Sequence, residues 1–143
     1  MSIRVLLIDD DGDDAEIFSD ALKEAGVSDA FDYFDDGLKA IEKLTNGASV
    51  PNIIFLDINM PSISGWECLR EIKKLAALQH IPIVMYSTSN LHNEGISARD
   101  IGAAAFLTKP DNFRELKNKL VNLFNELLDS RNLLLRILKR RKP

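Results

Sequence analysis

Five short apolar runs alternate along the chain with segments whose apolar residues recur at helical spacing, and this alternation limits the fold more than any other feature. The runs are rich in Ile, Val and Leu, which is typical of strands that are covered on both faces of a parallel sheet. Strands are predicted at residues 3–9, 30–34, 52–57, 81–87 and 104–107. Helices are predicted at residues 14–25, 37–45, 64–76 and 91–101 and from residue 111 onwards.

This order of elements predicts an α/β domain with a doubly wound, five-stranded parallel sheet and right-handed crossovers. The 143 residues, of which 45% are hydrophobic, suit one domain with its own core. Sheets of this kind bind ligands beyond the carboxyl ends of their strands. Functional residues are therefore expected at the strand ends.

Polar side chains stand at the ends of four of the predicted strands. Three carboxylates in one crevice repel each other and need a cation, and oxygen ligands suit a hard ion such as Mg²⁺. A lysine and a hydroxyl group beside them suit a phosphoryl group. The residues are Asp9 and Asp10 after the first strand, Asp57 at the third, Ser87 at the fourth and Lys109 just after the fifth.

Four segments of the chain resemble, in order and spacing, the receiver domains of two-component response regulators, among them the small chemotaxis regulator. The resemblance covers about residues 1–128 and is specific, because an acidic pair, an Asp-x-x-Met-Pro-x-x-x-Gly run and a late Lys-Pro pair rarely occur together. It implies a flavodoxin-like (βα)5 fold and a stand-alone receiver. The segments are Leu7-Ile8-Asp9-Asp10-Asp11, Phe55-Leu56-Asp57-Ile58-Asn59-Met60-Pro61 with Gly65, Met85-Tyr86-Ser87-Thr88, and Phe106-Leu107-Thr108-Lys109-Pro110.

By this resemblance, Asp57 accepts a phosphoryl group from a histidine kinase or a phosphotransfer protein and forms an aspartyl phosphate. Lys109 is expected to pair with a phosphoryl oxygen, and Ser87 to donate its hydroxyl group to the same phosphoryl group. The protein would catalyse only its own phosphorylation and dephosphorylation. We therefore expect a signalling protein, not an enzyme, that switches a binding surface for a downstream protein target.

The resemblance also implies a Mg²⁺ site. Asp10, Asp57 and the backbone carbonyl of Asn59 correspond to direct ligands, and Asp9 is expected to help through a water molecule. Mg²⁺ keeps several of its waters in proteins, so two carboxylates and one carbonyl suffice.

Two further expectations concern the Lys109–Pro110 bond and the residues that switch. In the family the bond corresponding to Lys109–Pro110 is usually cis, which X-Pro bonds tolerate at low cost, and this would aim the lysine inward. Ser87 and Phe106 are the expected switch residues, and the ring of Phe106 is expected to change rotamer. Threonine is commoner than Ser87 at its position, and tyrosine is frequent in place of Phe106, which lacks a hydroxyl group for a partner to recognise.

Other interpretations of these residues are disfavoured. A phosphatase of the haloacid dehalogenase type also forms an aspartyl phosphate with Mg²⁺, but it needs a second acid where this chain has Asn59. A receiver fold kept only as a binding scaffold does not need the complete set of site residues. Asp13 and Asp14 are interpreted as charges that stabilise the start of the first helix.

The chain is predicted to divide into a receiver domain over residues 1–128 and a C-terminal helical extension with a basic end over residues 129–143. Apolar residues along it follow heptad steps, and no Gly or Pro interrupts them before Pro143. We expect this helix to pair with a second chain as a homodimer; folding back onto its own domain is the alternative. The heptad positions are Leu116, Leu120, Leu123, Leu127, Ser130, Leu134 and Ile137.

The body of the chain and its end differ in charge. Residues 1–138 carry 14 basic and 22 acidic side chains, and a basic cluster over residues 139–142 follows. An acidic body repels phosphate backbones, so no nucleic-acid binding is expected. No apolar run approaches the ~18 residues of a membrane span, so we expect no membrane contact and a cytoplasmic location.

Overall fold

The predicted doubly wound, five-stranded parallel sheet is confirmed. The computed structural model describes residues 3–28, 30–47, 50–88 and 102–129. All neighbouring strands are parallel, in the order β2-β1-β3-β4-β5. The strands are β1 (Arg4–Ile8), β2 (Ala30–Phe34), β3 (Ile53–Leu56), β4 (Ile83–Ser87) and β5 (Ala105–Thr108).

Helices connect and follow the strands. The helix predicted over residues 91–101 lies outside the described residues. Within the described ranges, no helix is both long and apolar enough to span a bilayer. The helices are α1 (Gly12–Ala25), α2 (Gly37–Thr45), α3 (Gly65–Lys74), the 3₁₀ helix η1 (Ala76–Leu78) and α5 (Phe113–Asp129).

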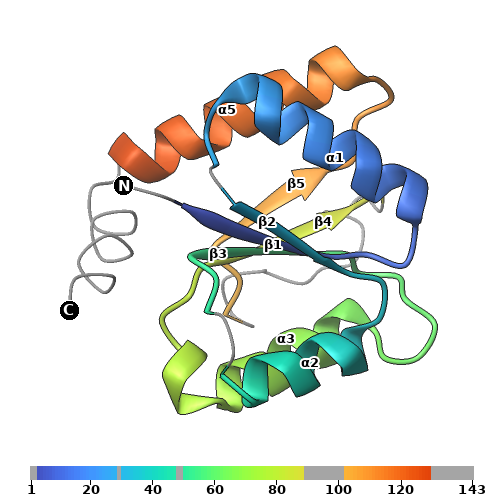
Figure 1. Ribbon diagram of the computed structural model, residues 1–143, viewed down its shortest axis with the longest axis vertical. Coiled ribbons are helices and arrows are strands. Elements are labelled where there is room, and N and C mark those ends of the chain that lie inside the picture. Colours follow the sequence, from blue (N-terminus) through green and yellow to red (C-terminus); the bar gives the residue numbers. More distant parts are fainter. Residues whose placement is uncertain (1–2, 29, 48–49, 89–101, 130–143) are drawn as a thin grey trace.

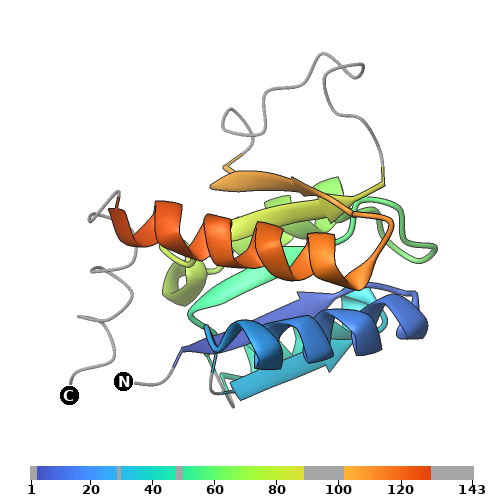
Figure 2. The same cartoon turned by 90° about the horizontal axis from the view of Figure 1, so that it is seen from above.

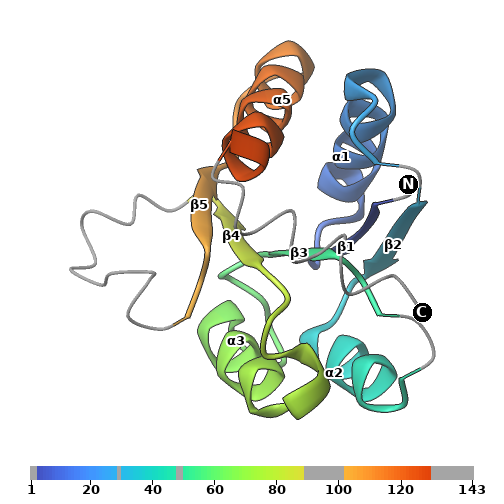
Figure 3. The same cartoon turned by 90° about the vertical axis from the view of Figure 1, so that its left-hand side faces the viewer.

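Two pairs of helices cover the two faces of the sheet. Helices α1 and α5 lie on one face, and α2 and α3 lie on the other (Figure 1 and Figure 3). Helices α1 and α5 also pack against each other along their length (Figure 2). The protein therefore has three layers, with the sheet in the middle and apolar side chains on both of its faces.

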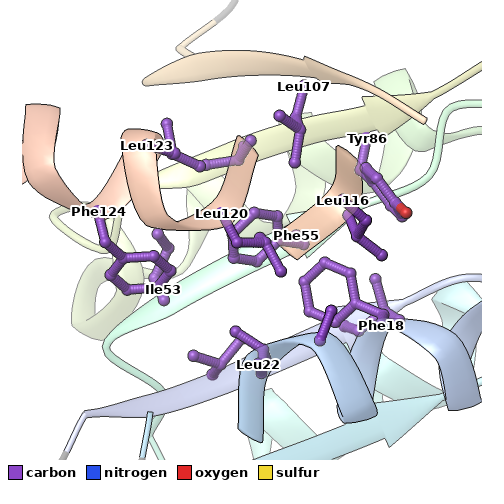
Figure 4. Packing of buried hydrophobic residues seen from close by; sticks show 14 of the residues in the cluster. Phe18, Leu22, Ile53, Phe55, Tyr86, Leu107, Leu116, Leu120, Leu123 and Phe124 are labelled. Atoms are coloured by element: carbon purple, nitrogen blue, oxygen red, sulfur yellow. The ribbon is translucent and has the colours of Figure 1, made fainter. Parts of the chain in front are cut away.

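Phe18 of α1 is at the centre of the core beneath α1 and α5 (Figure 4). Its ring centroid lies 4.9 Å from that of Phe55 and 5.3 Å from that of Tyr86, both in edge-to-face geometry. Aromatic pairs of this kind contribute about 0.5–1.5 kcal/mol beyond the burial of their area. The heptad leucines of α5 enter the same core; these are Leu116, Leu120, Leu123 and Leu127. This part of the predicted seam therefore faces the protein's own sheet.

Local signals determine the ends of the elements near the strand ends. The carboxylate of Asp11 accepts hydrogen bonds from the backbone N–H groups of Asp13 and Asp14, so α1 begins two residues earlier than predicted. The same helix ends at Gly26, whose φ of 69° is a left-handed conformation that glycine adopts easily. Strand β4 begins only after Pro82, which has no N–H group to donate to the ladder.

The register of the sheet aligns the carboxyl ends of its central strands. Ile8 of β1 pairs with Leu56 of β3, and Ser87 of β4 pairs with Thr108 of β5. The strand order reverses between β1 and β3, because the chain runs from β1 to β2 on one side and then to β3 on the other. Ligands of such sheets bind outside the carboxyl ends of the strands at this point of reversal.

Candidate functional site

Asp9 and Asp57 lie side by side beyond the ends of β1 and β3. The N–H of Asp57 donates to the carbonyl of Ile8 at 2.9 Å, and the N–H of Asp9 donates to the carbonyl of Phe34 at 3.1 Å. Asp9 is fully buried, and Asp57 is 5% exposed. Burying two carboxylates is costly unless cations compensate for the lost hydration. The backbone therefore holds two acids in a place that requires positive charge.

Asp10 adds a third carboxylate at the exposed rim. Oxygen atoms of Asp9, Asp10 and Asp57, one from each, all lie within 4.8 Å of one another. This spacing and the all-oxygen donor set suit a hard divalent cation such as Mg²⁺. Asn59, the fourth predicted ligand, is exposed, and its backbone N–H donates to the Asp57 carboxylate. The structure therefore brings the three predicted carboxylates together.

Among the described residues, Lys109 supplies the positive charge nearest to these acids. Its Nζ donates to Asp9 Oδ2 at 2.8 Å and to Asp14 Oδ2 at 2.9 Å, and it lies 3.8 Å from Asp57 Oδ2. Burial by itself would lower the pKa of Lys109, but the hydrogen bonds to the two carboxylates outweigh burial and raise this pKa above its usual value. The ammonium group therefore stays charged at neutral pH.

The pKa values of the two buried carboxyl groups are raised. Burial raises the pKa of Asp57 to about 7, against the lowering influence of the Lys109 charge. Burial also raises the pKa of Asp9, although its hydrogen bond from Lys109 acts in the opposite direction. One lysine therefore does not offset the cost of ionising these acids, and a divalent cation is favoured beside them.

Gly65 lets the start of α3 approach the backbone of Asp57. Its N–H donates to the carbonyl of Ile58 at 2.7 Å, and a Cβ atom at position 65 would collide with the carbonyl oxygen of Asp57. The hydroxyl group of Ser64 caps the helix by accepting the N–H of Glu67 at 3.2 Å. Helix α3 thereby fixes the loop that follows Asp57.

The two predicted switch residues, Ser87 and Phe106, lie in different parts of the structure. Ser87 is the last residue of β4 and is 1% exposed, and its carbonyl accepts the N–H of Lys109 at 2.9 Å. Phe106 packs on the α3 side of the sheet, where its ring contacts Trp66. The structure therefore brings Ser87 to the end of the sheet with Lys109 and places Phe106 beside α3.

Three further side chains take part in the site and were not predicted from the sequence. Asp14 pairs with Lys109, although its place in the first turn of α1 indicates only a helix-start charge. The Tyr33 hydroxyl donates to the backbone carbonyl of Asp9 at 2.7 Å, and Lys109 Nζ lies 5.2 Å from the centre of the Tyr86 ring. The available signal for Asp14 is its place in the first turn of the helix that follows Asp9 and Asp10.

The expectation of a cis bond between Lys109 and Pro110 is wrong, since there is no cis peptide bond in the described part of the chain. The trans form of an X-Pro bond is favoured by about 0.5–1 kcal/mol. With this bond in the trans form, Lys109 Nζ already reaches Asp9 and Asp14. The inward aim of the lysine therefore does not depend on the cis form.

Comparisons with known proteins agree on the kind of domain. The family model of the response regulator receiver domain matches residues 5–121. The response regulator Rcp1 of Synechocystis sp. is 31% identical over 117 residues, which are 78% of this chain and 80% of the relative. The crystal structure of the phosphorylated cyanobacterial phytochrome response regulator RcpA has a TM-score of 0.80 at 27% identity, covering 91% of this chain and 96% of that chain. The structure of the Mn²⁺-bound form of Rcp1 has a TM-score of 0.74 at 28% identity, and the match covers 85% of this chain and 91% of that chain.

The likeness extends over the parts that form the site. The matched residues include β1 with Asp9 and Asp10, the loop with Asp57, and Lys109 after β5. The solved structures therefore agree with the parallel sheet, and the family match spans the residues that form the acidic cluster. The chain belongs to the family of response regulator receiver domains, the phospho-acceptor proteins of two-component signal transduction.

Proposed function

We propose that Asp57 is the phospho-acceptor, and that it receives the phosphoryl group from a histidine kinase or a phosphotransfer protein. The observation that carries this proposal is the buried Asp57 carboxylate, which shares an acidic cluster with Asp9 and Asp10 and lies 3.8 Å from Lys109 Nζ. Asp57 follows the central strand β3 at the point where the strand order reverses. It is therefore a buried acid at the place where sheets of this kind bind their ligands.

In the proposed reaction, a carboxylate oxygen of Asp57 attacks the phosphorus in line and forms the new P–O bond. The bond between phosphorus and the donor breaks, and its electron pair leaves with the donor. Asp57 must be ionised to attack, and burial opposes ionisation by raising its pKa to about 7. Lys109 is positioned to pair with the phosphoryl oxygens, and the Ser87 hydroxyl is expected to donate to them.

Mg²⁺ is the proposed cofactor, with Asp10, Asp57 and the Asn59 carbonyl as direct ligands and Asp9 acting through water. When bound, the ion supplies positive charge that offsets the carboxylates and the transferring phosphoryl oxygens. The spacing of the three carboxylates fits such an ion. The Mn²⁺-bound form of Rcp1 supports a divalent cation, since that protein shares the fold.

The proposed output is a change in a protein-binding surface. Ser87 ends β4, Phe106 lies in β5, and both are predicted to move when Asp57 is phosphorylated. Phe106 is partly buried against Trp66, and a change in its rotamer is expected to remodel the face formed by β5, α5 and the helix predicted over residues 91–101, which lies outside the described residues. A downstream protein that binds there would distinguish the two states. Nucleic acid is not a proposed partner, because the body of the chain is acidic.

We also propose that the C-terminal extension forms a homodimer. The heptad leucines up to Leu127 are buried in the core of the domain, so a partner helix cannot contact them there. A dimer seam would therefore rest on Leu134 and Ile137, in the part of the sequence beyond α5. Light scattering on the full chain and on a chain ending at Leu128 tests this: the full chain should be dimeric and the shorter one monomeric. Two monomers would exclude the homodimer.

Phosphorylation by a small donor tests the proposed function itself. Acetyl phosphate with Mg²⁺ should label the wild-type protein, and hydroxylamine should remove the label because it cleaves acyl phosphates. Asp57→Asn should not be labelled. Asp32→Asn, a substitution of a half-exposed aspartate in β2, is the matched control and should be labelled like the wild type. A label that resists hydroxylamine and persists in Asp57→Asn would refute the assignment.

A further inference from the structure

Three aspartates surround Lys109, and one of them lies outside the carboxylate cluster. Nζ is 2.8 Å from Asp9 and 2.9 Å from Asp14, but 3.8 Å from Asp57. The cluster that suits a cation comprises Asp9, Asp10 and Asp57, without Asp14. Asp14 therefore pairs with the lysine but is not one of the carboxylates that could bind a metal ion.

Asp14 is the partner that Lys109 can release most easily. The side chain of Asp14 is 36% exposed, whereas that of Asp9 is fully buried. An ion pair with a partly exposed partner is worth little, because water replaces the lost contact. Asp9 is also held by the N–H of Asp11, which donates to its Oδ1 at 3.0 Å. If the lysine moves, the bond to Asp14 is the one whose loss costs least.

We propose that Asp14 is a positioning residue that retains Lys109 in the unphosphorylated protein and competes with the phosphoryl group for its ammonium group. The proposal rests on the proposed function, in which the phosphoryl group is on Asp57. A phosphoryl group adds negative charge and strong acceptor oxygens on the side of Asp57, which Nζ does not yet contact within hydrogen-bond distance. Asp14 thereby favours the unphosphorylated state, and its removal favours the phosphorylated state.

Binding of beryllofluoride, a mimic of the phosphoryl group, measures this competition. The full chain is titrated at saturating Mg²⁺, and the bound ion is followed by ¹⁹F NMR. Asp14→Asn should bind about two- to fivefold more tightly than the wild type, the effect of one partly exposed ion pair. Asp13→Asn is the matched control, because Asp13 is exposed in the same helical turn and is not among the ion-pair partners of Lys109 in the described chain. It should bind like the wild type.

A second pair of variants tests whether the effect passes through the lysine. In a Lys109→Gln background, Asp14→Asn should no longer change the affinity. Asp14→Glu, which restores the charge, should return the affinity towards the wild-type value. Equal affinities of Asp14→Asn and wild type, a gain shared by Asp13→Asn, or a gain that persists without Lys109 would each overturn the proposal. If the wild type itself does not bind the mimic, the proposed function fails instead.

Discussion

The indole ring of Trp66 contacts the ring of Phe106 edge to face, with centroids 6.1 Å apart and the ring planes at 60°. Trp66 follows Gly65 at the start of α3, the helix that is held against the backbone of Asp57. The contact therefore joins the surroundings of the proposed acceptor to the predicted switch residue in β5. Trp66 is also the only tryptophan of the chain, so the tryptophan fluorescence of the protein comes from this position.

Beryllofluoride with Mg²⁺ should change the emission of Trp66. If Phe106 leaves the indole ring when the site is occupied, the ring becomes more exposed to water and its emission shifts to longer wavelength. Phe106→Ala should give a similar spectrum without any ligand, and Asp57→Asn should not respond to the mimic. Unchanged emission in a protein that binds the mimic by ¹⁹F NMR would show that Phe106 stays in place.

Gly65→Ala should lower the free energy of unfolding by about 1–3 kcal/mol, because the new methyl group collides with backbone atoms of Asp57 and Ile58. It should also weaken Mg²⁺ binding, since the collision displaces the loop that carries Asp57. Gly12→Ala is the control: a Cβ atom at that position meets nothing within 4 Å, and alanine favours the helix. Urea unfolding of both variants measures the difference. Equal effects would mean that α3 is not held closely against Asp57.

Asp57→Asn should raise the stability of the metal-free protein at neutral pH by roughly 1–3 kcal/mol, because it removes a buried charge. Burial raises the folded-state pKa of Asp57 to about 7, above the value of about 4 in an unfolded chain. The stability contributed by the protonated carboxyl group is complete below about pH 4 and is lost as the pH rises towards 7.

The advantage of Asp57→Asn should therefore be largest above pH 7 and should shrink as the pH falls. Saturating Mg²⁺ should stabilise the wild type more than the variant, because the ion binds the ionised carboxylate. Urea unfolding at several pH values, with and without Mg²⁺, measures both effects. If the gain in the free energy of unfolding from Asp57→Asn instead grew as the pH falls, the pKa of Asp57 would not be raised by folding.

The sequence predicts the sheet and the clustering of Asp9, Asp10 and Asp57 well, because both follow from the pattern of strands and strand ends. An apolar run such as the one ending at Ile8 is stable as a strand that is covered on both faces of the sheet. The acids that follow parallel strands then meet at one edge of that sheet. The contact between Asp14 and Lys109 joins residues 95 positions apart and depends on the conformation of a long side chain. Residue spacing does not determine that conformation.

Two other features show where a pattern has more than one solution. The heptad spacing from Leu116 onwards suits a coiled coil, but a helix packed on a sheet buries the same stripe, and the described part of α5 does the latter. The isomer of the Lys109–Pro110 bond depends on a free-energy difference of about 0.5–1 kcal/mol, which neighbouring residues can easily reverse. Packing against the sheet decided the first of these, the direction that the heptad stripe faces.

The central claim, that Asp57 carries the phosphoryl group, is tested most directly by reductive trapping. Borohydride reduces an aspartyl phosphate to homoserine, which marks the phosphorylated position permanently. The protein is phosphorylated with acetyl phosphate and Mg²⁺, reduced and digested, and its peptides are sequenced by mass spectrometry. The account predicts homoserine at position 57, with Asp9 and Asp10 intact. Homoserine at either of those two positions beside an unmodified Asp57 would contradict it.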